Sequence, residues 1–315
     1  MSGRVLVTGA FGNLGQTVLA ELKDRGHHVT VLARDKPRNR RTARRLGGLV
    51  DDVAWGDVRT ADLDALVGRA DAVVHLAGLL PPHTEKAPDL AESINVGGTV
   101  RLIDAVEQAG HRPLFVFTSS VTVFGLPSEP VLRTVADPVR PSDHYTRHKV
   151  TVEERLQSGT ARFTILRVGV SVDARTLSTD LGTIRQLLRT HPDNPMEYVH
   201  PTDVATAIAA SVDAPDAVGK VLLIGGGESC RITQHEFLQV ALGSAGLRVP
   251  RDLLGSEPFY THWMDTVEAQ EILGFQHRTF GDYRAEMEER LRWVRPLVRP
   301  LSPAVVAVLR RWVRD

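Results

Sequence analysis

The first half of the chain alternates short apolar runs with longer stretches whose apolar residues have helical spacing. The runs, which are rich in β-branched residues, predict strands at 5–8, 29–33, 72–76, 114–118 and 163–166. The longer stretches predict helices at 14–25, 61–67, 90–109 and 143–157. Strands that alternate with helices and are apolar on both faces are typical of a parallel sheet covered on both sides. We therefore predict an α/β protein built on a Rossmann doubly wound parallel sheet.

The pattern loosens after residue 167 and resumes with a helix at 202–212, a strand at 221–224 and a helix at 234–242. A long amphipathic helix is predicted at 280–294, where apolar residues recur three and four positions apart. Its apolar face would consist of Phe280, Tyr283, Met287, Leu291 and Val294. We predict a Rossmann domain over residues 1–167. A smaller C-terminal substrate lobe over residues 168–315 would be interleaved with the last strands of the sheet.

Composition excludes several classes of function. The chain has 315 residues, 42% of them hydrophobic, which is enough for one large core and a smaller lobe. Basic and acidic residues number 38 each, so no overall field attracts polyanions, which argues against nucleic acid as a partner. The single cysteine, Cys230, offers neither a disulfide nor a metal-ligand spacing, and we predict no metal site. With no room for a signal peptide before Val5 and no membrane-spanning run, a soluble, cytoplasmic protein is expected.

A glycine-rich turn follows the first predicted strand and opens the first predicted helix. Gly9, Gly12 and Gly15 would allow a tight turn, a close approach to a pyrophosphate, and close packing of helix on strand. Such a turn also occurs where a strand merely bends sharply into a helix, but its place at the first strand–helix junction favours phosphate binding. The intervening loop residues expected to contact a dinucleotide are Phe11, Asn13 and Leu14.

The end of the second predicted strand bears on the choice between NADP and NAD. Enzymes that use NAD usually place an acidic residue there to hold the ribose hydroxyls, whereas this chain has Ala33 followed by Arg34. A guanidinium suits a 2′-phosphate, so we predict that NADP is preferred. Asp35 keeps NAD as the alternative. Arg38 is a weaker second candidate, because the basic stretch that contains it is also what a solvated helix surface would show.

A tyrosine and a lysine four residues apart lie in the helix predicted at 143–157. This spacing puts Tyr145 and Lys149 on one helical face, where the ammonium is expected to lower the phenol pKa from its usual value of about 10. Such pairs are common on ordinary helices. Together with the glycine loop and with Ser120 at the end of a predicted strand, however, they point to acid–base chemistry on Tyr145.

With these motifs in order, the chain resembles the extended short-chain dehydrogenase/reductases of the NAD-dependent epimerase/dehydratase type. The likeness runs from Val5 to about Gly227. Its further markers are Gly56-Asp57-Val58, His75-Leu76-Ala77-Gly78, Asn95-Val96-Gly97-Gly98-Thr99, Ser119 to Gly125, and His200 to Ala205. The resemblance implies an enzyme with a nicotinamide cofactor.

The resemblance also implies individual roles. Asp57 and Val58 would flank the adenine, and Leu76, Ala77 and Gly78 would line the cofactor. Val168, just after the strand predicted at 163–166, is counted with these contacts. Tyr145 and Lys149 would contact the cofactor too, with Lys149 bonding the nicotinamide ribose. Ser120 would hydrogen-bond the reacting oxygen, and Asn95 would support the site from its helix.

Three polar positions in these motifs have simpler explanations. His75 is interpreted as a packed strand residue, since interior histidines commonly serve packing. His200 and Asp203 are interpreted as caps of the helix that starts near Thr202.

The departures from the family pattern favour a small, fairly apolar substrate. Sugar-nucleotide epimerases of this type usually have an Asn shortly after the Leu166-Arg167 pair and a long segment that holds the diphosphate. This chain continues with Val168 and reaches His200 after only about thirty residues. Val121 and Thr122 replace the Asp-Glu pair of the dehydratases, and Phe124 replaces a Tyr near the substrate.

We therefore predict hydride transfer between a nicotinamide and a carbonyl or secondary alcohol of a small-molecule substrate. A sugar epimerase that retains its cofactor is the alternative, and a non-catalytic dinucleotide sensor is the least favoured. Family members commonly dimerise through helices equivalent to 90–109 and 143–157, so a homodimer is expected.

The C-terminal stretch predicts one more helix, in which Ser302 would cap, Pro303 would begin the first turn, and residues 304–309 are almost entirely apolar. We favour packing on the substrate lobe or on a partner subunit. The alternative is a helix that lies on a membrane surface. That alternative would favour a lipid-like substrate.

Overall fold

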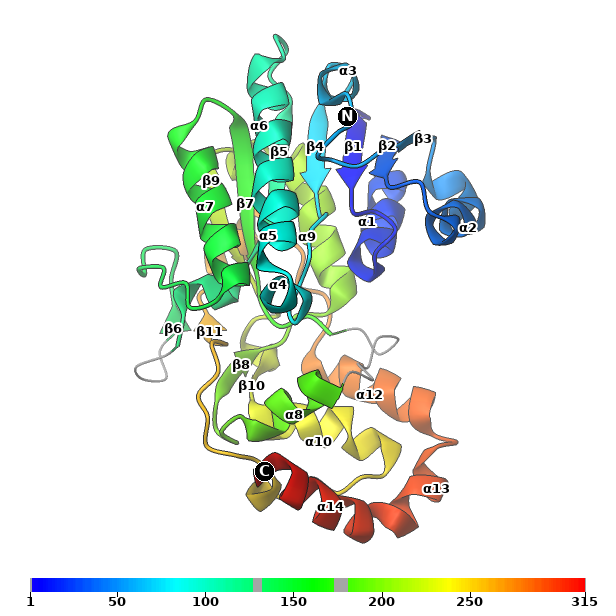
Figure 1. Cartoon of the computed structure of the whole chain (residues 1–315), viewed down its shortest axis with the longest axis vertical. Helices are drawn as coiled ribbons and strands as arrows, with labels where there is room; N and C mark the ends of the chain where they lie inside the picture. The colour runs from blue at the N-terminus through cyan, green and yellow to red at the C-terminus, as the bar shows by residue number, and fades with distance from the viewer. Residues whose placement is uncertain (1, 127–131, 173–180, 315) are drawn as a thin grey trace.

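The computed structural model describes residues 2–126, 132–172 and 181–314. Its centre is a seven-stranded sheet in which every strand pair is parallel, and Figure 1 shows a smaller lobe below it. The strand order is β3-β2-β1-β4-β5-β7-β9. The bounds are β1 Arg4–Thr8, β2 His28–Ala33, β3 Asp52–Trp55, β4 Ala72–His75, β5 Leu114–Ser120, β7 Arg162–Val168 and β9 Lys220–Ile224. This confirms the predicted Rossmann fold.

Helices cover both faces of the sheet because its strands are apolar on both sides. On β1, Val5 and Val7 pack into one core cluster and Leu6 into another. The first cluster is covered by α1 (Asn13–Asp24), α9 (Pro201–Asp213) and α11 (Val267–Leu273). The second is covered by α3 (Leu63–Val67), α6 (Thr99–Gln108) and α7 (His144–Ser158). The order reverses between β1 and β4, so ligands are expected at the carboxyl ends of these strands.

Several elements of the sheet domain differ from the predicted elements or decide between alternatives. The helix predicted at 90–109 is divided into α5 (Pro88–Glu92), a π-helical turn (Ser93–Gly98) and α6. Strand β3 was not predicted, because its side chains are only partly buried and lack a clear apolar run. The basic stretch forms α2 (Pro37–Leu46), which has no buried residue and is the solvated helix weighed as the alternative.

The lobe has its own core. A short antiparallel pair, β8 (Pro195–Glu197) and β10 (Arg231–Thr233), packs with α8 (Leu181–Arg189), α10 (Gln234–Ala241) and α12 (Phe280–Leu291). A second small sheet joins β6 (Leu132–Arg133) to β11 (Trp263–Met264). After β7 the chain enters this lobe and then returns to the sheet through α9 and β9. The boundary between residues 167 and 168 stays a prediction.

The last helices differ in part from expectation. Helix α12 ends at Leu291, and Val294 is exposed, so the predicted apolar face is wrong at its last residue. The chain then forms α13 (Arg295–Val298) and α14 (Ser302–Arg314). Helix α14 packs against α8, with Val306 buried in the lobe core, which confirms the favoured alternative for this segment. No helix in the described residues is long and apolar enough to cross a membrane.

Candidate active site

The glycine-rich turn is packed tightly against the end of β4. Gly9 has φ +73°, and a Cβ there would lie 2.6 Å from the backbone of both Leu76 and Ala77. A Cβ on Gly15 would lie 2.5 Å from the Gly9 carbonyl oxygen. Gly12 is the N-cap of α1, and no side chain caps the first turn. Because no side chain accepts a hydrogen bond from the first turn of α1, the backbone N–H groups of that turn are available to bind a pyrophosphate.

The neighbouring end of β2 carries exposed charges. Arg34 and Arg38 are both exposed. The Asp35 carboxylate accepts two hydrogen bonds from Arg40, with N–O distances of 2.5 and 2.6 Å, and this bonding lowers the Asp35 pKa. The Arg40 guanidinium lies 5.1 Å from the centre of the Trp55 ring. Asp35 is thus already paired, whereas Arg34 projects beside the strand end.

The residues predicted to flank the adenine lie at the end of β3. The Asp57 carboxylate accepts hydrogen bonds from Arg59 Nε and Nη2 at 2.9 and 3.0 Å, which lower the Asp57 pKa to about 2. The side chain of Val58 is buried, and a Cβ on Gly98 would lie 2.6 Å from it. Asp57 therefore presents a charged, fixed carboxylate, while Val58 anchors the loop in the core.

Asn95 fixes the segment that follows β4. Its Oδ1 accepts the Leu79 N–H at 2.7 Å, and its Nδ2 donates to the Leu79 carbonyl at 2.9 Å. A Cβ on Gly78 would lie 3.2 Å from the same Oδ1. The π-helical turn that carries Asn95 is a feature often found at functional sites. The amide thus holds in place the backbone next to Leu76, Ala77 and Gly78.

The histidine interpreted as a packing residue is buried in the sheet. His75 is hydrogen-bonded through its two ring nitrogens to the hydroxyls of Thr8 and Thr99, at 2.7 and 2.9 Å. Burial lowers the pKa of His75 to about 3, so the ring is neutral. This confirms the structural interpretation.

The prediction that His200 caps the helix is confirmed, whereas Asp203 is structural but does not cap it. His200 is the N-cap of α9, and its ring accepts the Thr202 N–H. Asp203 is fully buried, where it accepts the N–H groups of His277 and Arg278 and ties the start of α9 to a distant loop.

Tyr145 lies in the first turn of α7. Asp143 caps this helix, with Thr146 completing a reciprocal capping box. Glu85 from α4 (His83–Lys86) accepts the N–H groups of His144 and Tyr145 at 3.4 Å. These contacts fix the helix start, and with it the direction of the phenol.

Lys149 lies one turn further along α7 and points back to β5. Its Nζ donates to the Thr118 carbonyl at 2.6 Å and lies 4.7 Å from the Phe117 ring centre. The distance from Nζ to the Tyr145 ring centre is 5.6 Å. Burial lowers the Lys149 pKa to about 8. The predicted shared face of Tyr145 and Lys149 is therefore present.

Ser120 is oriented by a residue that the sequence analysis had not assigned to the site. Its Oγ accepts hydrogen bonds from the N–H and the hydroxyl of Thr122, at 3.3 and 2.9 Å. The Ser120 hydroxyl hydrogen is then available to the Tyr145 oxygen, and this interaction acts to lower the Tyr145 pKa. Val168 stands opposite Ser120 in the pairing of β5 with β7. The structure thus brings Ser120, Tyr145, Lys149 and Val168 together at one sheet edge.

The prediction that Lys149 lowers the pKa of the Tyr145 phenol is wrong for the chain by itself. Burial raises the Tyr145 pKa to about 12, the Ser120 hydrogen bond opposes this rise, and the Asp143 charge adds to it. Lys149 directs its ammonium to the Thr118 carbonyl, so desolvation of the phenolate outweighs its attraction.

Two further residues support the site without a sequence signal. Tyr260 donates its hydroxyl to Asp143 at 2.9 Å, which links the lobe to the cap of α7. Glu85, described above, also comes from a distant element. Both are remote from Tyr145 in sequence and belong to no motif.

Phe124 does not border the substrate, contrary to expectation. Its ring is 1% exposed and packs with Val121, Leu223 and Met264, and the Arg167 guanidinium lies 5.0 Å from its centre. The replacement of Tyr by Phe therefore says little about the substrate. Within the described ranges no group of His, Cys, Asp or Glu has a metal-binding arrangement.

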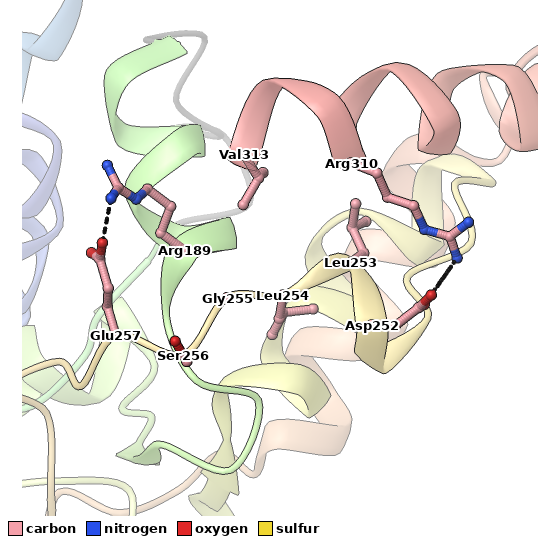
Figure 2. A pocket seen from close by; sticks show the side chains of 9 residues that line it. All are labelled: Arg189, Asp252, Leu253, Leu254, Gly255, Ser256, Glu257, Arg310 and Val313. Atoms are coloured by element: carbon pink, nitrogen blue, oxygen red, sulfur yellow. Dashed lines mark hydrogen bonds and ion pairs between the residues drawn. The ribbon is translucent and has the colours of Figure 1, made fainter. Parts of the chain in front are cut away.

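A cavity of about 390 Å³ lies elsewhere, in the lobe between α8 and α14 (Figure 2). Ion pairs Arg189–Glu257 and Arg310–Asp252 border it at 2.5 and 2.8 Å. None of the predicted site residues lines it. It is separate from the sheet edge that holds Tyr145.

Comparison with known proteins identifies the family. The model of the NAD-dependent epimerase/dehydratase family matches residues 5–225. The chain belongs to this family. The predicted resemblance to the extended short-chain dehydrogenase/reductases is thereby confirmed, and the relatives are NAD-dependent epimerases and dehydrogenases, as the prediction of an enzyme requires.

The similar proteins include both sugar-nucleotide epimerases and a hydroxysteroid dehydrogenase. UDP-glucose 4-epimerase from Streptomyces lividans is 32% identical over 50% of this chain, and the match spans about half of that enzyme, 47%. The 3 beta-hydroxysteroid dehydrogenase/Delta 5-->4-isomerase of Mycobacterium tuberculosis is 29% identical over 79% of this chain and 71% of that protein. The UDP-glucose-4-epimerase structure from Stenotrophomonas maltophila has a TM-score of 0.74, with 23% identity, and covers 96% of this chain and 99% of that one. That last likeness concerns the fold alone.

Proposed function

We propose that the chain is an NAD(P)-dependent oxidoreductase that transfers hydride between the nicotinamide and a carbonyl or secondary alcohol of a small, fairly apolar substrate. The observation that carries the proposal is the convergence of Ser120, Tyr145 and Lys149 at the carboxyl end of β5. In this proposal they act at the carbon–oxygen bond, and Asn95 positions the backbone beside them.

The proton chemistry follows from the hydrogen bonds. With a pKa of about 12, Tyr145 is protonated at neutral pH and can donate its proton to a carbonyl oxygen during reduction. The Ser120 oxygen accepts a hydrogen bond from the Thr122 hydroxyl. The Ser120 hydroxyl hydrogen is therefore free to donate to the substrate oxygen that gains negative charge. When bound, the nicotinamide supplies or accepts the hydride. In oxidation the Tyr145 oxygen takes the proton instead.

The proposed cofactor site runs from the glycine turn to Val168. The uncapped first turn of α1, which begins after Gly12, would hold the pyrophosphate, while Gly9 and Gly15 let the turn pack closely on its own backbone and on the end of β4. Phe11, Asn13 and Leu14 belong to the same turn.

The preference for NADP is part of the proposal. Exposed Arg34 at the end of β2 and the pairing of Asp35 with Arg40 support it, because no free carboxylate of Asp35 remains to repel a 2′-phosphate. NAD is bound in the solved structure of a short-chain dehydrogenase/reductase superfamily protein from Agrobacterium tumefaciens, which favours the alternative. Competition of NADP⁺ against NAD⁺ in a binding titration separates the two.

The choice of an apolar substrate rests on the chain after β7. The run Val168-Gly169-Val170 lacks the amide that sugar-nucleotide epimerases usually place there. The relative from Mycobacterium tuberculosis, which matches the larger share of this chain, is named for a hydroxysteroid. Both observations support a substrate without a diphosphate.

Sugar epimerisation is the second candidate, because several relatives are named UDP-glucose 4-epimerases. The test is to supply NADPH with a panel of apolar aldehydes and ketones and, separately, NAD⁺ with UDP-sugars. The oxidoreductase consumes NADPH in proportion to the alcohol formed. An epimerase would interconvert a UDP-sugar with no net change in the cofactor.

Assembly is proposed from the family likeness alone. We expect a homodimer whose interface is formed by helices α5, α6 and α7. Light scattering of the full chain tests this expectation. A monomer at micromolar concentrations would contradict this part of the proposal.

A further inference from the structure

The last helices of the lobe leave one apolar face uncovered. We define the outer face by its exposed residues: Trp293, Val294, Leu297, Leu301, Val305 and Val308. Trp293 and Leu297 are each 73% exposed, and Val308 is 66% exposed. An exposed, contiguous apolar patch on a folded protein marks an interaction surface.

These residues lie on one side because the chain winds as a nearly continuous helix. From α12 through α13 to α14, the junction residues Arg292, Val294, Arg299 and Ser302 all have right-handed helical dihedrals. Exposed apolar residues therefore recur at intervals of about one turn. In Figure 1 helices α13 and α14 form the edge of the lobe farthest from the sheet.

The opposite side of the run is already engaged by the lobe. Val306 is buried, and the Ser302 hydroxyl, instead of capping α14, accepts the Arg248 N–H at 2.8 Å. A Cβ on Gly246 would lie 2.7 Å from the Arg295 carbonyl, so α13 is pressed closely on the lobe. Arg310, shown in Figure 2, is paired with Asp252. The run is thus held in place, and only the outer face remains without a cover in the described part of the chain.

The charge around the outer face identifies the kind of partner. Residues 290–314 contain seven arginines and no Asp, Glu or Lys, although the whole chain has zero net charge. Arg295, Arg299 and Arg311 are exposed, and none has an ion pair with another described residue. Arg292 lies 5.0 Å from the centre of the Trp293 ring. Arginines that border Trp, Leu and Val are the composition of a helix that lies on an anionic membrane surface.

We propose that the outer face binds the surface of an anionic lipid bilayer. Trp293, Leu297 and Leu301 enter the headgroup boundary, while Arg292 beside Trp293 and Arg311 near the end of α14 pair with lipid phosphates. A second copy of the chain fits less well, because a symmetric contact would set these arginines against their own equivalents. Helices α13 and α14 lie at the opposite end of the molecule from α7, which carries Tyr145 (Figure 1), and this inference does not depend on the proposed reaction.

The test is sedimentation of the full chain with vesicles of phosphatidylcholine alone or in equal parts with phosphatidylglycerol. Binding to the anionic vesicles is expected, with a blue shift of the fluorescence that Trp293→Phe abolishes. The double variant Leu297→Asp/Leu301→Asp should lose most of the binding. Arg292→Gln/Arg311→Gln should lower it by about tenfold or more, since each arginine at a charged surface contributes about fivefold.

The matched control is Val267→Asp, which places the same charge at a valine of α11 that is 62% exposed, as Leu301 is. It should bind vesicles as the wild type does. Equal sedimentation of the wild type with and without phosphatidylglycerol would overturn the proposal. So would a lipid-free dimer that Leu297→Asp/Leu301→Asp dissociates in light scattering, because a second copy would then cover the face. Unchanged thermal melting shows that the variants are folded.

Discussion

The two ends of the proposed cofactor site contrast in how their charged groups are held. At the end of β5, the ammonium of Lys149 and the phenol of Tyr145 are half-buried, hydrogen-bonded and shifted in pKa by desolvation. At the end of β2, Arg34 is exposed and Asp35 is paired on the surface. Water screens the second end and not the first. Substitutions should therefore change the reaction strongly at β5 and only tune cofactor choice at β2.

The largest effect is expected for Tyr145→Phe. The substitution keeps the ring and removes the only proton that the proposed mechanism transfers, so kcat should fall by roughly 10²–10⁴-fold. Cofactor affinity, measured by titration, should change little. A variant with full kcat would remove Tyr145 from the mechanism and erase the contrast between the two ends.

A smaller effect is expected for Thr122→Val, which keeps the side-chain shape. Ser120 loses its hydroxyl donor at 2.9 Å and is freer to turn its hydrogen away from the substrate oxygen. We expect kcat to fall about tenfold, within the range for one lost hydrogen bond to a developing charge, with KM nearly unchanged. Thr122→Ser retains the hydroxyl and should restore kcat. If Thr122→Ser is as slow as Thr122→Val, the orienting role is refuted.

At the other end, Arg34→Ala should weaken NADP⁺ binding by about tenfold, as expected for one screened hydrogen bond to a charged phosphate. NAD⁺ binding should be nearly unchanged, because it lacks that phosphate. Arg38→Ala serves as the neighbouring control, with a smaller loss. Equal losses for both cofactors would show that Arg34 acts on the fold of the loop.

The smallest expected effect is on how the free energy of unfolding depends on pH. The Lys149 pKa is lowered from 10.5 to about 8, so between these values the unfolded chain binds more protons than the folded chain. Lys149 therefore makes the free energy of unfolding rise with pH over this window, by at most about 1.4 kcal/mol per pH unit. Urea denaturation of the wild type and Lys149→Met at several pH values measures the difference. A wild-type slope no steeper than that of the variant would show that Lys149 is not desolvated.

The raised Tyr145 pKa acts in the opposite direction at higher pH. Between its usual value of 10.0 and about 12, the unfolded phenol is ionised and the folded phenol is not, so stability falls as pH rises. Comparison with Tyr145→Phe isolates this contribution.

The same contrast explains what the sequence could predict. The glycine turn, the alternation of strands with helices and the Tyr145–Lys149 face depend on local spacing and backbone geometry, which sequence records directly. The direction of the Tyr145 pKa shift depended on burial and on Asp143, which only the packed structure reveals.

Contacts between distant segments could not be predicted either. Glu85 and Tyr260 reach the start of α7 from elements far away in the chain, and no motif connects them to Tyr145. Likewise, Phe124 matches a family position, yet packing with Leu223 and Met264 from later strands decides that it is core. The apolar pattern at 280–294 identified α12 but not its end, because the chain there continues as an exposed face.

The central claim is that hydride moves between cofactor and substrate carbon beside Tyr145. The most direct measurement supplies NADPH that carries deuterium at the transferable position, together with an accepted carbonyl compound, and analyses the product by mass spectrometry. With the wild type we expect product that carries one deuterium on the carbon bearing the new hydroxyl. With Tyr145→Phe we expect only traces of this product. Product without deuterium, or a UDP-sugar epimerised while the cofactor keeps its label, would contradict it.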